Sequence, residues 1–77
     1  MNFSIGDIVS YKGEDPFWKK GEIHIIYEAC YLGNGELDFS TNKGAWFSQN
    51  DFDLVEKASK KSFKQLDKDM ELGKYAG

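Results

Sequence analysis

The sequence predicts a mainly β domain, an antiparallel meander of five short strands that is followed by one C-terminal helix. Between Gly21 and Phe52, three apolar segments are separated by two turn signals, Gly33-Asn34-Gly35 and residues 41–44. After Glu56 the apolar residues change from alternation to helical spacing. A chain of 77 residues with six Phe, four Tyr and two Trp is expected to form one domain with an aromatic core.

The first strand is expected at residues 7–12, where a β-rich run follows a Gly-Asp turn. Residues 13–16 form a loop, because Pro16 has no N–H to donate to a sheet. The second strand is expected from Glu22 to about Leu32.

The second strand is predicted to have two different faces. By the period of two, the core face holds Ile23, Ile25 and Tyr27, and the solvent face holds Glu22, His24 and Glu28, with Ile26 as an exception. Further along, Cys30 and Leu32 are the expected core residues, although they have the opposite parity. The change of parity predicts a bulge near Glu28-Ala29, and such a bend lets a small sheet curl onto itself.

The third and fourth strands are expected at residues 36–40 and 45–48. Their inward side chains are predicted to be Leu37, Phe39 and Phe47. Trp46, by contrast, is expected on the solvent side. A single helical turn capped by Ser48 is expected to precede a last strand at residues 52–55.

A C-terminal helix is expected at residues 62–72. Ser62 and Gln65 have the spacing of a capping box, and Gly73 is a suitable stop. One face of this helix carries Phe63, Leu66 and Met70. A helix this short needs a partner for that apolar stripe, either the sheet or a second copy of the chain, so a monomer and a homodimer are both open. Residues 74–77 are expected to be a frayed end.

Composition limits the cellular setting and the partners. The single cysteine allows no internal disulfide, and no signal peptide or membrane-spanning run is evident, so we expect a cytoplasmic protein without a membrane partner. Residues 1–56 hold four Lys against ten acids, a net charge of −6, whereas residues 57–77 hold six Lys against three acids, a net charge of +3. The chain has no Arg, which makes recognition of nucleic acid less expected.

Three stretches resemble SH3-like barrels: residues 5–9 (Ile-Gly-Asp-Ile-Val), residues 21–23 (Gly-Glu-Ile) and the segment from Gly44-Ala45-Trp46-Phe47 to residues 51–55. The resemblance covers residues 3–56, which predicts a barrel at 1–56 and a helix and tail at 57–77 that pack on it or on a partner. The loop between the first two strands is short, unlike that of signalling SH3 domains. The sequence is more similar to small SH3-like proteins of bacteria and phages, and loosely to Tudor and KOW barrels. The resemblance implies a binding module, in the host cytoplasm if phage-encoded.

Candidates for catalysis are few. His24 has no second histidine or partner cysteine for a metal site, and Cys30 lies in an apolar run where a core role is expected. The acidic pairs Glu14-Asp15 and Glu36/Asp38 are more typical of exposed surface than of a cation site or a glycosidase. We therefore expect no enzyme, no metal and no cofactor.

Two sets of side chains are candidates for binding. Tyr11, Trp18 and Trp46 are predicted to form an aromatic patch among acids that contacts a protein partner, although they can also simply cap the barrel. Lys57, Lys60, Lys61 and Lys64 form a basic segment that can contact nucleic acid or be a solvated surface. The favoured function is protein–protein binding by a small accessory or inhibitory protein from a phage or mobile element, whose acidic face can imitate nucleic acid. The alternative is a nucleic-acid-binding module that uses the basic segment.

Overall fold

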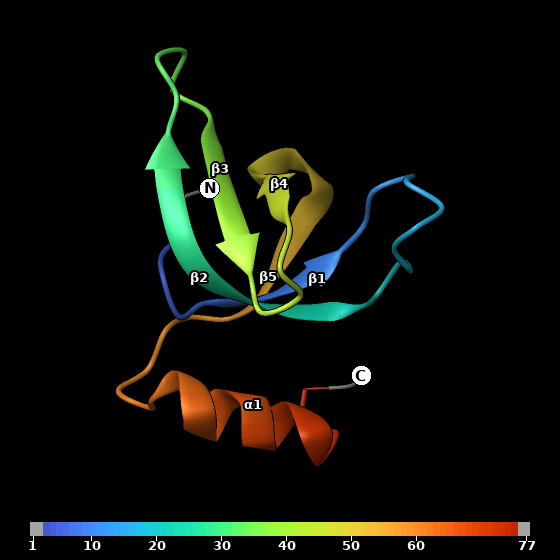
Figure 1. Cartoon of the computed structure of the whole chain (residues 1–77), viewed down its shortest axis with the longest axis vertical. Helices are drawn as coiled ribbons and strands as arrows, with labels where there is room; N and C mark the ends of the chain where they lie inside the picture. The colour runs from blue at the N-terminus through green and yellow to red at the C-terminus, as the bar shows by residue number, and fades with distance from the viewer. Residues whose placement is uncertain (1–2, 76–77) are drawn as a thin grey trace.

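The computed structural model describes residues 3–75, which form five antiparallel strands and one α-helix (Figure 1). The strands are β1 (Ile8–Tyr11), β2 (Ile23–Tyr31), β3 (Leu37–Thr41), β4 (Trp46–Ser48) and β5 (Phe52–Glu56). A 3-10 turn, η1 (Gln49–Asp51), joins β4 to β5, and the helix α1 spans Phe63–Glu71. The mainly β architecture with a C-terminal helix is therefore confirmed, and every element lies where the sequence predicts it.

The strands form one sheet in the order β4-β3-β2-β1-β5. β2 is its central strand and pairs with β1 through Ile23–Ile25 and with β3 through Ile26–Tyr31. The pairing of β2 with β3 shifts between Ile26 and Glu28, close to the predicted bulge. This shift lets β2 curve from the base of the sheet up into the β2–β3 hairpin, as Figure 1 shows.

One apolar cluster, here called the inner cluster, lies on the concave side of the sheet. It consists of Phe3, Val9, Tyr11, Ile26, Leu37, Phe39, Phe47 and Phe52. Aromatic rings meet edge to face or tilted within it: the ring centroids of Phe39 and Phe52 are 5.1 Å apart, and those of Phe3 and Phe39 are 5.8 Å apart. Such pairs add to the stabilisation that comes from burial of the rings.

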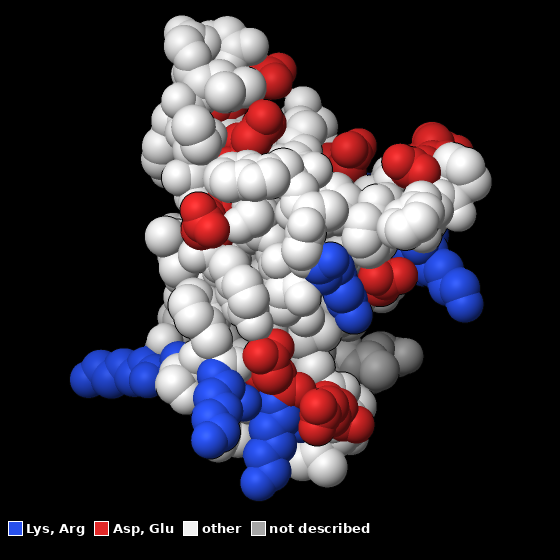
Figure 2. Space-filling model, viewed as in Figure 1, with Lys and Arg blue, Asp and Glu red and all other residues white. Residues whose placement is uncertain are grey.

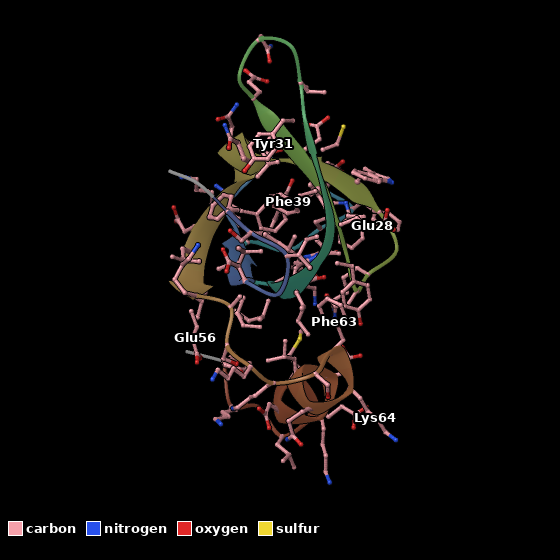
Figure 3. All side chains as sticks on the ribbon, turned by 90° about the vertical axis from the view of Figure 1, so that its left-hand side faces the viewer. Glu28, Tyr31, Phe39, Glu56, Phe63 and Lys64 are labelled. Carbon is pink, nitrogen blue, oxygen red and sulfur yellow. The ribbon has the colours of Figure 1, made fainter. Side chains whose placement is uncertain are left out.

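A second apolar cluster, here called the helix cluster, lies between β2 and α1. It consists of Ile8, Ile25, Leu66 and Tyr75, with Ile23, Tyr27 and Met70 packed against it. The ring of Phe63 contacts that of Tyr27 with centroids 4.6 Å apart, at the junction visible in Figure 3. The predicted apolar stripe of the helix thus packs on the sheet of its own chain.

The predicted faces of the first half of β2 are correct only in part: Ile23, Ile25 and Tyr27 do share one side, but that side belongs to the helix cluster. His24 was expected on the solvent face, but it is fully buried beside the inner cluster. Ile25 was expected to join Leu37 and Phe39, but it belongs to the helix cluster instead. The physical reason is that this part of β2 is covered on both sides, by the curled sheet on one and by α1 on the other, so alternation does not separate core from solvent.

The predicted core positions at the end of β2 are also wrong. Cys30 is exposed, and Leu32 retains 38% of its surface. In Figure 1 the β2–β3 hairpin projects beyond the other strands, and no other strand or helix of residues 3–75 lies beside its tip. An apolar run at the end of a strand therefore does not guarantee burial.

The ends of the helix follow the predicted chemistry in part. The Ser62 side chain accepts a hydrogen bond from the Gln65 N–H, as in a capping box. The Gln65 side chain, however, donates to Asp69 at 3.0 Å instead of accepting a hydrogen bond from the Ser62 N–H. Gly73 has a φ of +73°, which suits a residue that ends a helix. Tyr75 is buried, so the end is not frayed at this position, and residues 76–77 lie outside the described residues.

Two buried carboxylates hold the C-terminal segment in place. Asp7 accepts hydrogen bonds from the backbone N–H of Ser4 and of Ala58 at 2.8 and 2.7 Å, and from Lys57 Nζ at 3.0 Å. Asp69 accepts from Lys61 Nζ at 3.0 Å, and hydrogen bonds from Lys61 and Gln65 lower the pKa of Asp69 below its ordinary value. Asp7 connects the start of the segment after β5 to the N-terminal region, whereas Asp69 joins Lys61, Gln65 and the residues after α1 within that segment.

Candidate protein-interaction surface

The three residues of the predicted aromatic patch lie in different environments. Tyr11 is 3% exposed and belongs to the inner cluster, which corrects its predicted place on the surface. Trp18 is half-buried, and its ring packs against those of His24 and Phe47, with centroids 5.5 and 5.0 Å away. Trp46 is 56% exposed, on the solvent side as predicted. Of the three, only Trp46 offers most of its side chain to a partner.

The pairing of β2, β3 and β4 places Trp46 on a surface with two acids. Glu28 pairs with Ser40, which pairs with Trp46, and Cys30 pairs with Asp38, which pairs with Ser48. Directly paired residues point to the same side of a sheet. We call the resulting surface the outer face; it consists of Glu28, Cys30, Asp38, Ser40, Trp46 and Ser48.

The outer face has negative charge without a matching cation. Neither Glu28 nor Asp38 forms an ion pair within the described residues 3–75. Elsewhere in the sheet region, Lys12 pairs with Asp53 at 2.9 Å and Lys20 pairs with Glu14 at 3.0 Å. Figure 2 agrees: in this view the lysines lie around α1, at the base of the sheet and at the β1–β2 loop, whereas the charged side chains at the hairpin end are all acidic.

His24, the single histidine, is a core residue with an unusual environment. Its Nδ1 lies 2.9 Å from Thr41 Oγ1, while Nε2 is buried without a hydrogen bond, 3.5 Å from Glu22 Oε2. Burial lowers the pKa of His24 to about 4; the nearby Glu22 carboxylate opposes this change and Lys43 adds to it. The imidazole is therefore neutral at physiological pH and lies among aromatic rings, out of reach of a large ligand.

The basic segment is partly occupied by internal contacts. Lys57 pairs with Asp7, and Lys61 pairs with Asp69, each at 3.0 Å. Lys60 and Lys64 are exposed. Two of the four predicted lysines are thus engaged in internal ion pairs, Lys57 with the N-terminal region and Lys61 with α1.

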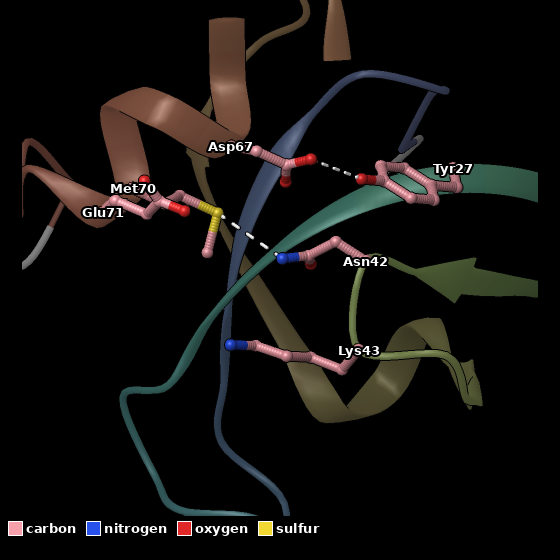
Figure 4. Close-up of a pocket in the computed structure, with 6 residues that line it drawn as sticks. All are labelled: Tyr27, Asn42, Lys43, Asp67, Met70 and Glu71. Atoms are coloured by element: carbon pink, nitrogen blue, oxygen red, sulfur yellow. Dashed lines mark hydrogen bonds between the residues drawn. The ribbon is translucent and has the colours of Figure 1, made fainter. Parts of the chain in front are cut away.

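An open groove lies between α1 and the β3–β4 turn, with a volume of about 440 Å³ (Figure 4). We call it the helix groove; it is lined by Tyr27, Asn42, Lys43, Asp67, Met70 and Glu71. The Tyr27 hydroxyl donates to Asp67 at 2.9 Å, and burial and this contact together raise the pKa of Tyr27. Sequence reasoning did not find this groove, because its two walls are 24 or more positions apart and no spacing signal connects a turn to a helix.

Two further observations concern the described residues 3–75. They contain no group of three or more His, Cys, Asp or Glu side chains that could hold a metal ion. Their helix is also too short and too polar to cross a membrane. Comparisons with protein-family models, with curated proteins and with solved structures found no match.

Proposed function

We propose that this chain is a non-catalytic binding module that holds a basic segment of a protein partner on its outer face. The observation that carries the proposal is the strand pairing that sets the exposed Trp46 on the same face as Glu28 and Asp38. Tryptophan is frequent among the residues that dominate binding energy at interfaces, and its ring also attracts cations. Unpaired carboxylates beside it favour lysine or arginine in the partner.

We further propose that the curled sheet is an SH3-like barrel, as the sequence resemblance implies. The strand order, the shift within β2 and the 3-10 turn before β5 support this proposal. Small barrels of this kind serve mainly as binding modules, which agrees with an accessory or inhibitory role for a protein of this size.

The proposal is tested by affinity capture from an extract of the native host, with wild type and three surface variants. A captured protein should be retained by wild type and lost with Trp46→Ala, because the main anchor is removed. The double variant Glu28→Gln/Asp38→Gln should weaken its capture about thirtyfold, since each of the two charge-assisted contacts contributes on the order of 1 kcal/mol. Tyr31→Ala is the matched control, because Tyr31 is 68% exposed at the hairpin but does not belong to the outer face. Full capture by Trp46→Ala would contradict the proposal.

The alternative function is nucleic-acid binding through Lys60 and Lys64. A titration with duplex DNA and RNA at several salt concentrations distinguishes it from protein binding. Binding to phosphates would weaken steeply as the salt concentration rises. It would also be lost with Lys60→Gln/Lys64→Gln and retained with Trp46→Ala. The two functions therefore predict opposite responses to the same pair of variants.

A further inference from the structure

The helix groove has opposite charges on its two walls. Asp67 and Glu71, one helical turn apart, provide carboxylates from α1. Lys43 provides an ammonium group from the β3–β4 turn, and Figure 4 shows its side chain extending on the side away from Asp67. The ring of Tyr27 and the thioether chain of Met70 also line the groove, so apolar surface is available between the charged groups.

The hydrogen-bonding groups of this groove are only partly used. The Asn42 Oδ1 accepts from the Ile25 N–H at 2.8 Å, which fixes the orientation of the amide. Its Nδ2 is consequently directed toward α1, where it contacts Met70 Sδ at 3.7 Å, and a thioether is a weak acceptor. Within the described residues 3–75, neither Lys43 nor Glu71 has an ion-pair partner. Donors thus remain on the turn side of the groove and acceptors on the helix side.

We propose that the helix groove binds a small ligand with a cationic group at one end, a carboxylate at the other and a short apolar stem between them. Arginine has this form, either as the free amino acid or as the last residue of a peptide. Its guanidinium would bind Asp67 and Glu71, and its carboxylate would bind Lys43 Nζ and Asn42 Nδ2. A planar guanidinium also suits carboxylates and an aromatic ring better than an ammonium group does.

The proposal is separate from the proposed function, because the groove and the outer face share no residue. The charged groups of the groove are accessible to water, and exposed ion pairs are individually weak. We therefore expect a dissociation constant on the order of 1 mM for arginine alone.

The direct test is an NMR titration of the full chain, with backbone amide shifts as the readout. The probes are L-arginine, agmatine, which lacks the carboxylate, and L-citrulline, which has a neutral ureido group in place of the guanidinium. Arginine should shift the amides of Asn42, Lys43 and residues 67–71 in a saturable manner. Agmatine and citrulline should each bind about tenfold more weakly, because each loses one charge-assisted contact. Equal binding of arginine and agmatine would overturn the proposal, as would shifts confined to the outer face.

A fourth probe distinguishes the two sources of the ligand. Nα-acetyl-L-arginine keeps the guanidinium and the carboxylate but lacks the α-ammonium group, like the end of a peptide chain. Binding as tight as that of arginine assigns the groove to a C-terminal arginine. Weaker binding assigns it to the free amino acid.

Matched variants test each end of the ligand. Lys43→Gln should reduce arginine binding to the level of agmatine and leave agmatine unchanged, whereas Glu71→Gln should weaken both. Lys19→Gln is the control, because Lys19 is exposed and lies outside the groove. An unchanged arginine affinity in Lys43→Gln would overturn the proposal. Trp46→Ala should bind arginine normally, so a failure of protein capture and a failure of arginine binding can be told apart.

Discussion

The inner cluster and the helix cluster lie on opposite sides of the same strand, but they are stabilised differently. Consecutive residues of β2 enter them alternately: Ile25 belongs to the helix cluster and Ile26 to the inner cluster. The inner cluster is rich in aromatic rings and collects residues from all five strands. The helix cluster is smaller and mainly aliphatic, and the contacts of Asp7 with Ala58 and of Tyr27 with Asp67 fasten the segment that covers it. From this comparison we expect the sheet to remain folded when the helix is released, and we expect the helix to unfold when the sheet is lost.

Removal of the central ring of the inner cluster should have the largest effect. Phe39 is fully buried and contacts the rings of Phe3 and Phe52. Phe39→Ala should lower the free energy of unfolding by about 3–5 kcal/mol, which is comparable with the total free energy of unfolding of a small domain. Urea unfolding followed by circular dichroism should show loss of sheet and helix together. A variant that keeps a cooperative transition near that of wild type would contradict the central role of this cluster.

Acid should weaken the inner cluster through His24. The unfolded chain protonates this imidazole near its ordinary pKa of 6.5, whereas the folded chain does so only near 4. The unfolded state therefore binds more protons between these values, so stability is full above pH 6.5 and is lost as the pH falls toward 4. The loss should reach about 3 kcal/mol at pH 4, as measured by urea unfolding at successive pH values.

His24→Phe should remove this pH dependence, because a phenyl ring fits among aromatic neighbours and cannot be protonated. The contribution of Asp69, whose pKa is below its usual 3.8, is lost only at lower pH and should remain in the variant. Direct NMR titration of the wild-type imidazole provides an independent check. An imidazole that titrates near pH 6.5 in the folded protein would refute the explanation.

Disruption of the helix cluster should be milder and more local. Leu66 is 3% exposed and is the most buried side chain that α1 places against β2. Leu66→Ala should lower the free energy of unfolding by about 2–3 kcal/mol, because the variant loses the buried isopropyl group between α1 and β2. A helix of this length is marginal by itself and depends on that contact. Hydrogen exchange should show faster exchange in α1 with protection retained in β2 and β3. Equal loss of protection in both elements would show that the two clusters unfold as one.

The smallest change in stability should come from the outer face. Trp46 has 56% of its surface exposed and makes no ring contact with another aromatic residue of the described chain. Trp46→Ala should therefore change the free energy of unfolding by no more than about 0.5 kcal/mol. Thermal unfolding checks this value, and a large loss would indicate a structural role for the ring.

The sequence was most informative where one side of an element meets water. In β3, Leu37 and Phe39 alternate with the polar Asp38 and Ser40, and the prediction that Leu37 and Phe39 point inward was confirmed. The same rule failed in β2, where His24, Ile25 and Ile26 are all fully buried. Alternation carries no information about a strand that is covered on both sides.

For the candidate surfaces, too, the sequence predicted single exposed residues but not their grouping. Trp46 could be assigned to solvent from the pattern of β4 alone, but its grouping with Glu28 and Asp38 required the register of three strands. The helix groove could be found only from the packing of α1 on the sheet, because α1 and the β3–β4 turn meet only after the chain has folded.

By itself the sequence determined the elements of this protein: the turns, the helix cap at Ser62, the bulge in β2 and the exposed Trp46. These features depend on local backbone preferences and on hydrogen bonds between near neighbours, which the order of residues specifies directly. Only the tertiary structure decided that His24 is buried, that Cys30 is exposed and that Tyr11 is part of the core. Those outcomes depend on which distant segment covers each residue, and the period of the apolar residues does not show whether one or both faces of a strand are covered.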